Sequence, residues 1–264
     1  MPKSNYYYFK EQEKNKNREG LLGLKKEIKE IYKLSKSTYG YRRITIELNK
    51  QEGVKYNHKK IYRLCLEMDL LAKIKRKKYK KYTPGEISEN ILAQDFYSDE
   101  PYRKLVTDIT EFRIANVKYY VCPVLDLFNR EILAIRISMR ANSTFTTRTL
   151  RAALRKCKGS KEIIIHSDQG RQFTSSKFKG LIKSRKHIAS NSRKGNCFDN
   201  AVIENFFSNF KSELIYNKEI TSKEMLYKDI NDYIYFYNNK RIQIKTKMSP
   251  IEVKNNYYKL KNVS

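Results

Sequence analysis

The chain has no tryptophan, only nine glycines and five prolines, and few cysteines or histidines for its 264 residues. Its four cysteines stand far apart and form no CxxC pair, which argues against a disulfide framework and predicts a reducing compartment. With three histidines, no zinc cluster of finger-like spacing can be drawn. No apolar run approaches the roughly 20 residues of a membrane span, and the first twenty residues carry no apolar signal region. We therefore expect a cytoplasmic protein without a membrane partner.

Acidic residues are also scarce: 28 Asp and Glu stand against 56 Lys and Arg, for a formal net charge of +28. Folding does not require such an excess, because like charges repel one another in the compact state. A polyanionic partner explains it, since Lys and Arg gain affinity by releasing counterions from phosphates. AT-rich codon usage can supply lysine without function, but it does not explain the two-fold imbalance over acids. The composition therefore predicts a nucleic-acid-binding protein.

The first third of the sequence predicts short helices. Apolar residues recur at helical spacing over 21–36, 42–52 and 58–69, with Asn57 as the N-cap of the third helix. The exposed face of that third helix would carry three basic residues, Lys59, Lys60 and Arg63. This pattern fits a helix-turn-helix module that sets its last helix in the major groove of DNA. An ordinary helical pair with a solvated basic face fits the spacing equally well, and the connector EGVKYN is longer than the usual tight turn.

A basic block follows these helices. Seven of the nine residues at 73–81 are Lys or Arg, among them Lys75, Arg76, Lys77 and Lys78. Such a run cannot pack in a core and is typical of an arm along a phosphate backbone. We predict a helical DNA-binding region over 1–82 with its basic arm at 73–82, and a linker over 83–95 that begins at a Thr-Pro-Gly break.

After residue 100 the sequence changes to short β-branched and aromatic runs. Strands fit 105–114, 118–128, 131–138 and 162–168, and helices fit 143–157, 174–185, 199–216 and 221–238. This order predicts an α/β fold with a mixed central sheet. Pro123, inside the second run, cannot donate a ladder hydrogen bond and indicates an edge strand or a bulge.

Three carboxylates lie where a metal site can form. Asp108 interrupts an apolar strand, Asp168 closes an Ile-rich strand, and Glu204 falls in the first turns of a helix. Taken singly, they can be a salt-bridged strand residue, a turn residue and a helix-surface residue. Together they offer the oxygen ligands that a pair of Mg²⁺ or Mn²⁺ ions needs to activate a nucleophile and stabilise a leaving oxygen in line.

The neighbours of these carboxylates receive separate predictions. Lys211 follows Glu204 by two helical turns, so we expect both side chains on one face and the ammonium near a DNA phosphate. We interpret Asp126 as structural, Asp199 as a helix cap, and His166 as a support for strand packing or for the site. DNA contacts are also expected from Arg193, Lys194 and Asn200.

The motifs around the three carboxylates resemble those of a known family. VTDITEF (106–112), IIHSDQGRQFTS (164–175) and NSRKGNCFDNAVIENFFSNFKSE (191–213) are similar to the OrfB transposase of the bacterial IS-three family, within the retroviral-integrase superfamily. Thirty-five residues separate Asp168 from Glu204, which is the spacing of the D,D-35-E pattern. The segments STYGYRRITIELN and NHKKIYRLCLEMDL resemble the family's helix-turn-helix, and YIYFYNNKRIQ resembles its C-terminal motif. Leu105 stands where a Trp is usual and Asn191 where a Met is usual, and Pro123 interrupts the second strand.

The resemblance implies an RNase H-like mixed-sheet catalytic core over 96–216, preceded by the small all-α helix-turn-helix-like region and followed by a helical extension over 217–264. It implies a DNA transposase in which Asp108, Asp168 and Glu204 hold two Mg²⁺ or Mn²⁺ ions. These would support hydrolysis at the element ends and attack by the freed 3′-hydroxyl on a second phosphodiester.

The implied partners are double-stranded DNA, further copies of the chain on that DNA, and an upstream-frame protein or its frameshift fusion that recognises the ends. The implied location is the nucleoid. The sequence shows no leucine-zipper heptads, which agrees with a separate upstream partner.

Two alternatives stay open. A nuclease of the same fold would cut DNA or an RNA–DNA hybrid without a joining step. A helix-turn-helix regulator with an inactive nuclease-like domain is the non-enzymatic alternative, and it would have no reason to keep the three carboxylates at this spacing.

Overall fold

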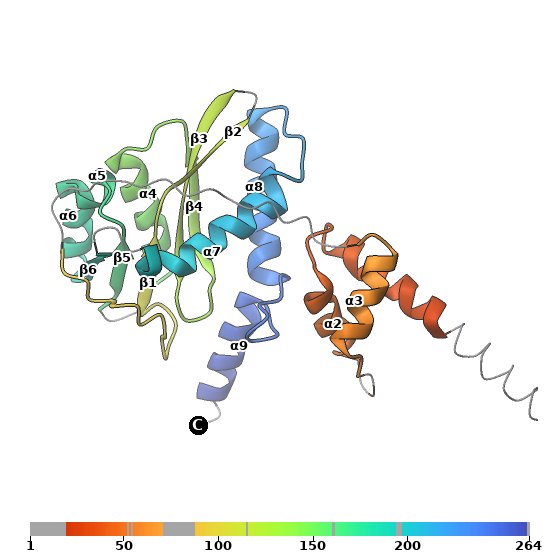
Figure 1. Ribbon diagram of the computed structural model, residues 1–264. Coiled ribbons are helices and arrows are strands. Elements are labelled where there is room, and N and C mark those ends of the chain that lie inside the picture. The colour runs from red at the N-terminus through yellow and green to blue at the C-terminus, as the bar shows by residue number, and fades with distance from the viewer. Residues whose placement is uncertain are drawn as a thin grey trace, which may run out of the picture. The chain divides into compact units, whose positions relative to one another are not determined.

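The computed structural model describes residues 20–51, 53, 55–70, 88–114, 116–159, 162–193 and 197–262. Contacts divide the chain into two compact units, 1–74 and 75–264, which are considered separately (Figure 1). No helix among the described residues is long and apolar enough to cross a membrane. Five basic residues with expected DNA contacts lie outside the described residues: Lys75, Arg76, Lys77, Lys78 and Lys194.

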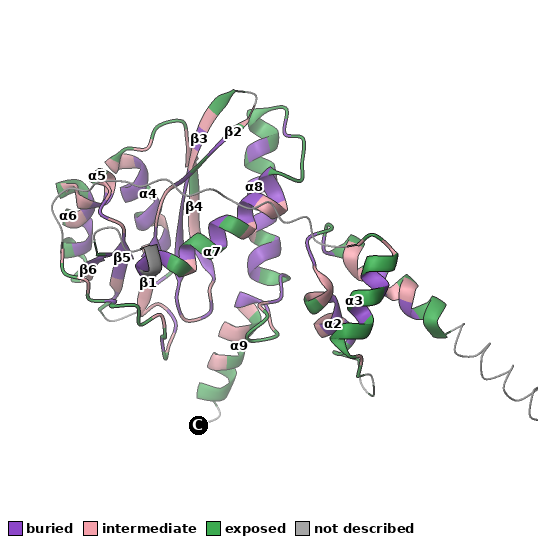
Figure 2. Cartoon of the chain, viewed as in Figure 1, coloured by how far each residue is buried: buried purple, intermediate pink, exposed green. Residues whose placement is uncertain are grey.

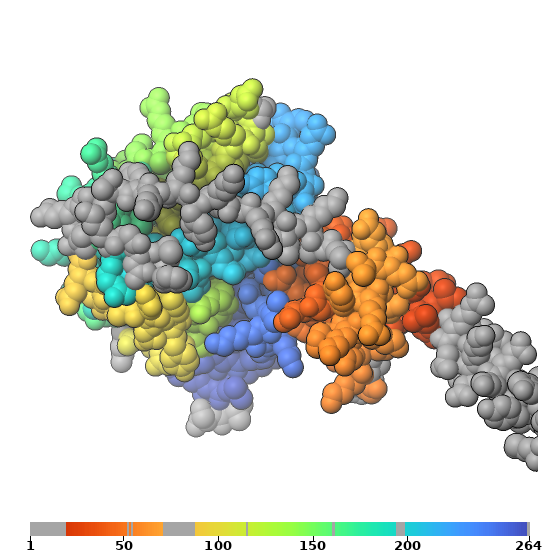
Figure 3. All heavy atoms as spheres, viewed as in Figure 1, coloured from red at the N-terminus to blue at the C-terminus, as the bar shows by residue number. Residues whose placement is uncertain are grey.

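The described part of the N-terminal unit contains three helices, as the apolar spacing predicts. They span residues 20–34, α2 (Tyr41–Leu48) and α3 (His58–Glu67). Each buries one side and exposes the other (Figure 2). Of the apolar stripe predicted for α3, Ile61, Leu64 and Cys65 are buried, whereas Met68 is half-buried just after the helix. Asn57 caps α3 by accepting a hydrogen bond from the backbone N–H of Lys59 at 2.9 Å. The opposite face of α3 is at the surface of this unit (orange in Figure 3).

The second unit is built on a mixed six-stranded sheet, which confirms the predicted fold class. Its strands are β1 (Lys104–Thr107), β2 (Thr110–Ile114), β3 (Val117–Asp126), β4 (Ile132–Ser138), β5 (Ile164–Ser167) and β6 (Ile188–Asn191). β3 pairs antiparallel with β1, β2 and β4, whereas β1–β5 and β5–β6 are parallel. The predicted strand over 105–114 is divided at Asp108, and β6 was not predicted.

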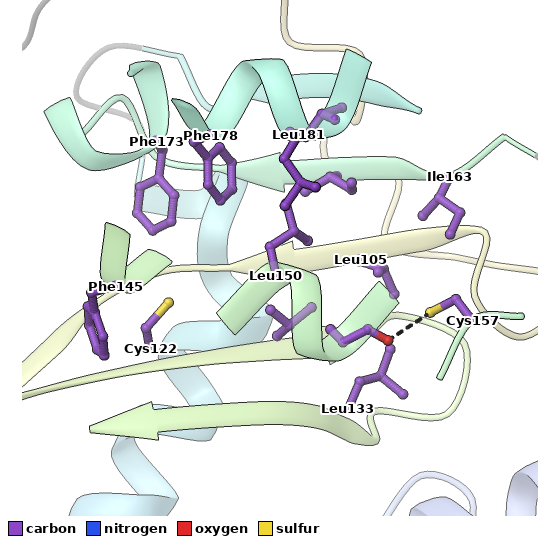
Figure 4. Close-up of a cluster of buried hydrophobic side chains, with 14 residues drawn as sticks. Leu105, Cys122, Leu133, Phe145, Leu150, Cys157, Ile163, Phe173, Phe178 and Leu181 are labelled. Atoms are coloured by element: carbon purple, nitrogen blue, oxygen red, sulfur yellow. Dashed lines mark hydrogen bonds between the residues drawn. The ribbon is translucent and has the colours of Figure 1, made fainter. Parts of the chain in front are cut away.

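Helices cover both faces of this sheet. They are α4 (Ser143–Leu154), α5 (Arg171–Thr174), α6 (Ser176–Ser184), α7 (Ala201–Phe210), the π-helical turn η2 (Lys211–Ile215), α8 (Lys223–Asn239) and α9 (Pro250–Lys261). Figure 4 shows the apolar core that joins strands β1, β3, β4 and β5 to α4 and α6. Cys122 and Val124 of β3 belong to this core, so the alternation of the strand turns Leu125 towards the other face. There Phe206 of α7 packs edge-to-face on Tyr237 of α8, with ring centroids 5.1 Å apart.

Buried polar pairs attach the C-terminal helices to this unit. Arg241, 1% exposed, donates to Glu213 of η2 through Nε at 2.8 Å and Nη2 at 2.6 Å, and the Tyr233 hydroxyl donates to the same carboxylate at 3.0 Å. Lys254 of α9 forms an ion pair with Glu131 beside the β3–β4 turn. These pairs attach α8, the segment after it and α9 to the sheet unit.

Pro123 lies inside the sheet, so the predicted edge position is wrong. β3 pairs with β4 on one side and with β1 and β2 on the other. The pairings Thr107↔Val124 and Thr110↔Val121 follow one register, and the interruption between β1 and β2 therefore faces Pro123. The Pro123 carbonyl accepts a hydrogen bond from Thr107 Oγ1 at 2.8 Å. The missing N–H of the proline thus coincides with an existing gap in the ladder. The alternative prediction, a bulge, matches an irregular register between Val124 and Leu125.

Candidate active site

Asp108 lies in the gap between β1 and β2. The parallel register between β1 and β5 pairs Lys104 with Ile164 and Val106 with His166. Continued by two residues, this register brings Asp108 beside Asp168, at the ends of two adjacent strands. Asp108 is partly exposed and accepts a hydrogen bond from the backbone N–H of Ile109 at 2.6 Å.

A tight turn orients Asp168. Its carboxylate accepts a hydrogen bond from the backbone N–H of Gly170 at 2.9 Å. A Cβ at Gly170 would lie 2.9 Å from both Asp168 Oδ1 and Gln172 Oε1, so only glycine fits without displacing them. Asn191 Nδ2 donates to the Asp168 carbonyl at 3.0 Å and to Ser167 Oγ at 3.1 Å. Asn191, which departs from the family pattern, therefore supports the turn that presents Asp168.

Glu204 is the third of the predicted carboxylates. It is exposed on α7, one turn into the helix. Burial raises the pKa of Asp108 well above its usual value, and the nearby charges of Asp168 and Glu204 raise it further against the opposing Ile109 hydrogen bond. Burial also raises the pKa of Asp168. The structure thus places Asp168 and Glu204 near enough to Asp108 for their charges to raise its pKa. In the described part of the chain, however, no three His, Cys, Asp or Glu side chains are arranged to hold a metal ion.

Lys211 occupies a different environment from the one expected. Only 6% of it is exposed, and its ammonium donates to the backbone carbonyl of Glu111 in β2 at 2.6 Å. Glu204, seven residues earlier, is exposed. The helical period gives the direction of a side chain but not the depth of its surroundings, and here Lys211 points at the sheet. The expected contact of Lys211 with a DNA phosphate does not match this position.

Asp199 and Asn200 also differ from their predictions. Asn200 occupies the N-cap position of α7, yet no side chain there forms a capping hydrogen bond. Asp199 is instead a buried acceptor whose donors include the backbone N–H and guanidinium of Arg193. Arg193 keeps 59% of its side chain exposed, so it can still reach a phosphate. Asn200 is buried, which argues against the DNA contact expected of it.

The three basic residues expected on α3 are exposed. Lys59, Lys60 and Arg63 all lie on its outer face, and the Lys60 ammonium stands 5.6 Å from the centre of the Tyr56 ring. Tyr62, 42% exposed, shares this face and packs edge-to-face on Tyr41. Helical spacing could have identified Tyr62, because it follows Lys59 by three positions and so lies on the same side of the helix. These side chains form a basic and aromatic surface of the kind that contacts nucleic acid.

His166 and Asp126 have structural roles, as predicted. His166 is fully buried with Nδ1 at 2.9 Å from Ser190 Oγ, and burial lowers its pKa to about 4, so the ring is neutral near pH 7. Asp126 accepts hydrogen bonds from the backbone N–H groups of Tyr102 and Phe128 at 2.9 and 3.0 Å. Burial raises the pKa of Asp126 to about 6 despite these bonds. Both residues stabilise the ends of strands. The candidate site therefore consists of the three carboxylates.

Comparisons with known proteins identify the family of the chain. The chain matches family models for an integrase core domain at 98–197 and 204–257 and for an HTH-like domain at 21–78. It is 38% identical over 261 residues to a protein named as the transposase InsK for insertion sequence element IS150 of Escherichia coli strain K12, covering 98% of this chain and 91% of that protein. It is 33% identical over 207 residues to the transposase InsF for insertion sequence IS3A of the same strain, covering 76% of this chain and 70% of that protein.

A solved structure shares the fold. A chain of the simian T-cell lymphotropic virus intasome, determined in complex with the PP2A regulatory subunit B56 gamma, superimposes with a TM-score of 0.51 at 15% identity. The match covers 85% of this chain and 73% of that one.

Proposed function

This chain belongs to the insertion-sequence transposases with an integrase core, and from that premise we propose that Asp108, Asp168 and Glu204 are its catalytic residues. Membership of this family makes DNA transposition and integration its function. The finer proposal is a Mg²⁺- or Mn²⁺-dependent reaction at one site. Water hydrolyses a phosphodiester at an element end and leaves a 3′-hydroxyl. That hydroxyl then attacks a second phosphodiester, so that one P–O bond forms for each one broken.

One observation carries this proposal: carboxylates from two distant motifs raise the pKa of Asp108. Asp168 and Glu204 both act on Asp108, which burial already disfavours as a charged group. Such a cluster is costly in a folded protein unless a cation compensates it. Hard divalent cations prefer carboxylate oxygen, and all three of these residues are carboxylates. The chemistry of these donors, rather than their present arrangement, therefore fits Mg²⁺ or Mn²⁺.

The chain's own groups would prepare the site. The N–H groups of Ile109 and Gly170 orient the carboxylates of Asp108 and Asp168, and Asn191 holds the carbonyl of Asp168. Glu204 approaches from the exposed side of α7, where its movement does not disturb the core. Asp108, Asp168 and Glu204 would hold two divalent ions, which when bound neutralise charge on the attacking and leaving oxygens.

Double-stranded DNA is the proposed substrate and partner. The exposed face of α3 supplies Lys59, Lys60 and Arg63, and Arg193 stands at the surface of the sheet unit. Family membership further supports an assembly of several copies on DNA at the nucleoid. The upstream-frame protein, or its frameshift fusion with this chain, is proposed to recognise the element ends.

Labelled duplexes that carry the terminal repeat test this function. We expect cleaved and joined strands in Mg²⁺ and neither in excess EDTA. Asp108→Asn, Asp168→Asn and Glu204→Gln should each lower the cleavage rate by about 1000-fold or more while duplex affinity stays within about 2-fold. Glu224→Gln, an exposed carboxylate on α8, is the matched control and should cleave normally. Cleavage without joined products would identify a nuclease, and cleavage in EDTA would exclude the metal-dependent reaction.

A further inference from the structure

Residues 88–94, here called the strap, lie against the end of β6. The backbone N–H of Ser88 donates to Asn191 Oδ1 at 3.3 Å, and the backbone N–H of Asn191 donates to the Glu89 carbonyl at 3.3 Å. Leu92 is 1% exposed, and its backbone N–H donates to Ser190 Oγ at 3.1 Å. The strap is therefore a fixed part of the sheet unit, although it precedes the first strand by about ten residues.

Two side chains of the strap end on Asp199. Asn90 Nδ2 donates to Asp199 Oδ2 at 2.9 Å, and Gln94 Nε2 donates to Asp199 Oδ1 at 3.0 Å. Arg193 adds its backbone N–H at 2.8 Å and two guanidinium contacts. Asp199 is 0% exposed, and these donors, Arg193 first, hold its pKa below the usual value against the effect of burial. Asp199 is thus a buried anion with every accepting direction in use.

The backbone of the strap is strained at the point of contact. Ala93 and Gln94 both have positive φ, 44° and 66°, a conformation that is unfavourable for residues with a Cβ. This double left-handed turn aims the Gln94 amide at Asp199. Strain of this kind persists only where surrounding interactions over-determine it. The strap is consequently shaped for its bonds with Asp199.

Hydrogen bonds to Asp199 hold the start of the helix that carries Glu204. It belongs to the 3₁₀ turn Cys197–Asn200, which leads directly into α7. Since the N-cap Asn200 forms no side-chain capping bond, Asp199 supplies the side-chain bonds that anchor this start. Glu204 follows Asp199 by five residues, so a displacement of Asp199 moves the Glu204 carboxylate with it.

The same strap also touches the support of Asp168. Asn191, bonded to Ser88 and Glu89, holds the Asp168 carbonyl. Ser190, bonded to Leu92, contacts His166, two residues before Asp168. The strap is thus bonded both to the support of Asp168 and to the start of the helix that carries Glu204.

We propose that Asp199 is a positioning residue, and that the strap sets the separation of Asp168 and Glu204 by binding Asp199 and Asn191 together. This inference rests on the proposed catalytic role of those two carboxylates. According to this inference, the stretch between the basic arm and the core affects the rate of strand cleavage. A purely structural strap would change stability and leave the turnover of folded protein unaltered.

Single and double variants at Asn90 and Gln94 test the inference in the full-length chain. We expect Asn90→Ala with Gln94→Ala to lower kcat for cleavage by about 10- to 100-fold, with KM for the duplex within about 2-fold. Asn255→Ala, an exposed amide on α9, is the matched control and should match the wild type. Thermal unfolding of each variant confirms that folded proteins are compared.

A reciprocal exchange separates positioning from simple loss of packing. Asn90→Asp places a second carboxylate against Asp199 and should lower kcat. Adding Asp199→Asn restores a donor–acceptor pair between these two positions, so kcat of the double variant should exceed that of either single variant. Equal activity in all three folded variants would overturn the inference.

Hydrogen exchange gives a readout independent of activity. In the Asn90→Ala, Gln94→Ala variant the amides of α7 should exchange about 10-fold faster, while those of α4 stay unchanged. If the wild type fails to cleave DNA, the proposed function fails and the positioning role fails with it, whereas the exchange data still show whether the strap holds α7. If the wild type cleaves and the folded variant keeps wild-type kcat or α7 protection, the positioning role is wrong and the function stands.

Discussion

Replacing Asp108 with Asn should stabilise the metal-free protein and abolish its response to Mg²⁺. Burial and the charges of Asp168 and Glu204 raise the pKa of Asp108, so the folded state disfavours its ionised form. Unit charges 4 Å apart repel by about 4 kcal/mol at an effective dielectric of about 20. Asn keeps an oxygen that accepts the Ile109 N–H. Because the site is partly exposed, we expect the free energy of unfolding near neutral pH to rise by about 1–2 kcal/mol.

This gain should depend on pH in a defined direction. Below the usual Asp pKa of about 3.9, Asp108 is protonated in both the folded and the unfolded chain, and its carboxyl costs no stability. As pH rises through the raised pKa of the folded state, the unfolded chain ionises more readily and the wild type loses stability. The difference between Asp108→Asn and wild type should therefore be small near pH 4 and grow towards neutral pH.

Urea unfolding in EDTA and in Mg²⁺ measures both effects, with hydrogen exchange of β1 and β5 peptides reporting on the sheet unit alone. Mg²⁺ at ten times its Kd should stabilise the wild type by about 1.4 kcal/mol and leave Asp108→Asn unchanged. Asp232→Asn, an exposed carboxylate on α8, should behave as wild type in both conditions. The reasoning is refuted if Asp108→Asn is less stable than wild type in EDTA, or if it keeps the full response to Mg²⁺.

Gly170→Ala should lower the cleavage rate by about 10-fold or more, because its Cβ would displace the Asp168 carboxylate; a wild-type rate in a gel assay would contradict this. Arg241→Met should lower the free energy of unfolding by about 3–5 kcal/mol, because it leaves the buried Glu213 without its cation. Arg103→Met, at an exposed ion pair with Glu100, should lower it by less than about 1 kcal/mol in the same denaturant titration. Neutralising four basic residues of the block at 73–81 should flatten the slope of log affinity against log salt by about 3–4 units, and an unchanged slope would mean that the block is a solvated linker. The chain alone should prefer a terminal repeat over a scrambled duplex by less than about 1000-fold at physiological salt, and a stronger preference in matched titrations would make the upstream partner dispensable for end recognition.

Local pattern was sufficient for most of the fold. Runs of β-branched residues predicted β3, β4 and β5, and predicted β1 and β2 as one strand. Apolar periodicity predicted α3, α4 and α8, because each of these elements carries its own buried face. β6 was missed since IASN has no such run. It is a strand only because it pairs in parallel with β5, with Ile188 opposite Ile164. Its existence depends on a neighbour that lies 24 residues away in sequence.

Predictions for individual side chains failed where the partner is distant in sequence. Asp199 stands before a helix and so fits a cap, yet two of its side-chain donors, Asn90 and Gln94, precede it by more than a hundred residues. Lys211 has the helical spacing of a surface neighbour of Glu204, yet it reaches the carbonyl of Glu111 in β2. The helical period determines in which direction a side chain points from the helix axis. How deeply that side chain is buried depends on the elements that pack against that side of the helix.

Pro123 and Asp108 together show how an apparent defect in a strand can serve the site. Proline in a central strand removes a ladder hydrogen bond, and this is why the sequence indicated an edge. One register runs from Thr107↔Val124 to Thr110↔Val121, which places Asp108 opposite Pro123. At that position β1 has ended and β2 has not begun, so no ladder hydrogen bond from residue 123 is needed. An uninterrupted strand would bond Asp108 into the ladder, whereas the gap lets its side chain turn back to the Ile109 N–H beside Asp168. The departure from the family pattern at Pro123 is therefore compatible with the candidate site, because it lies where the chain already leaves the sheet.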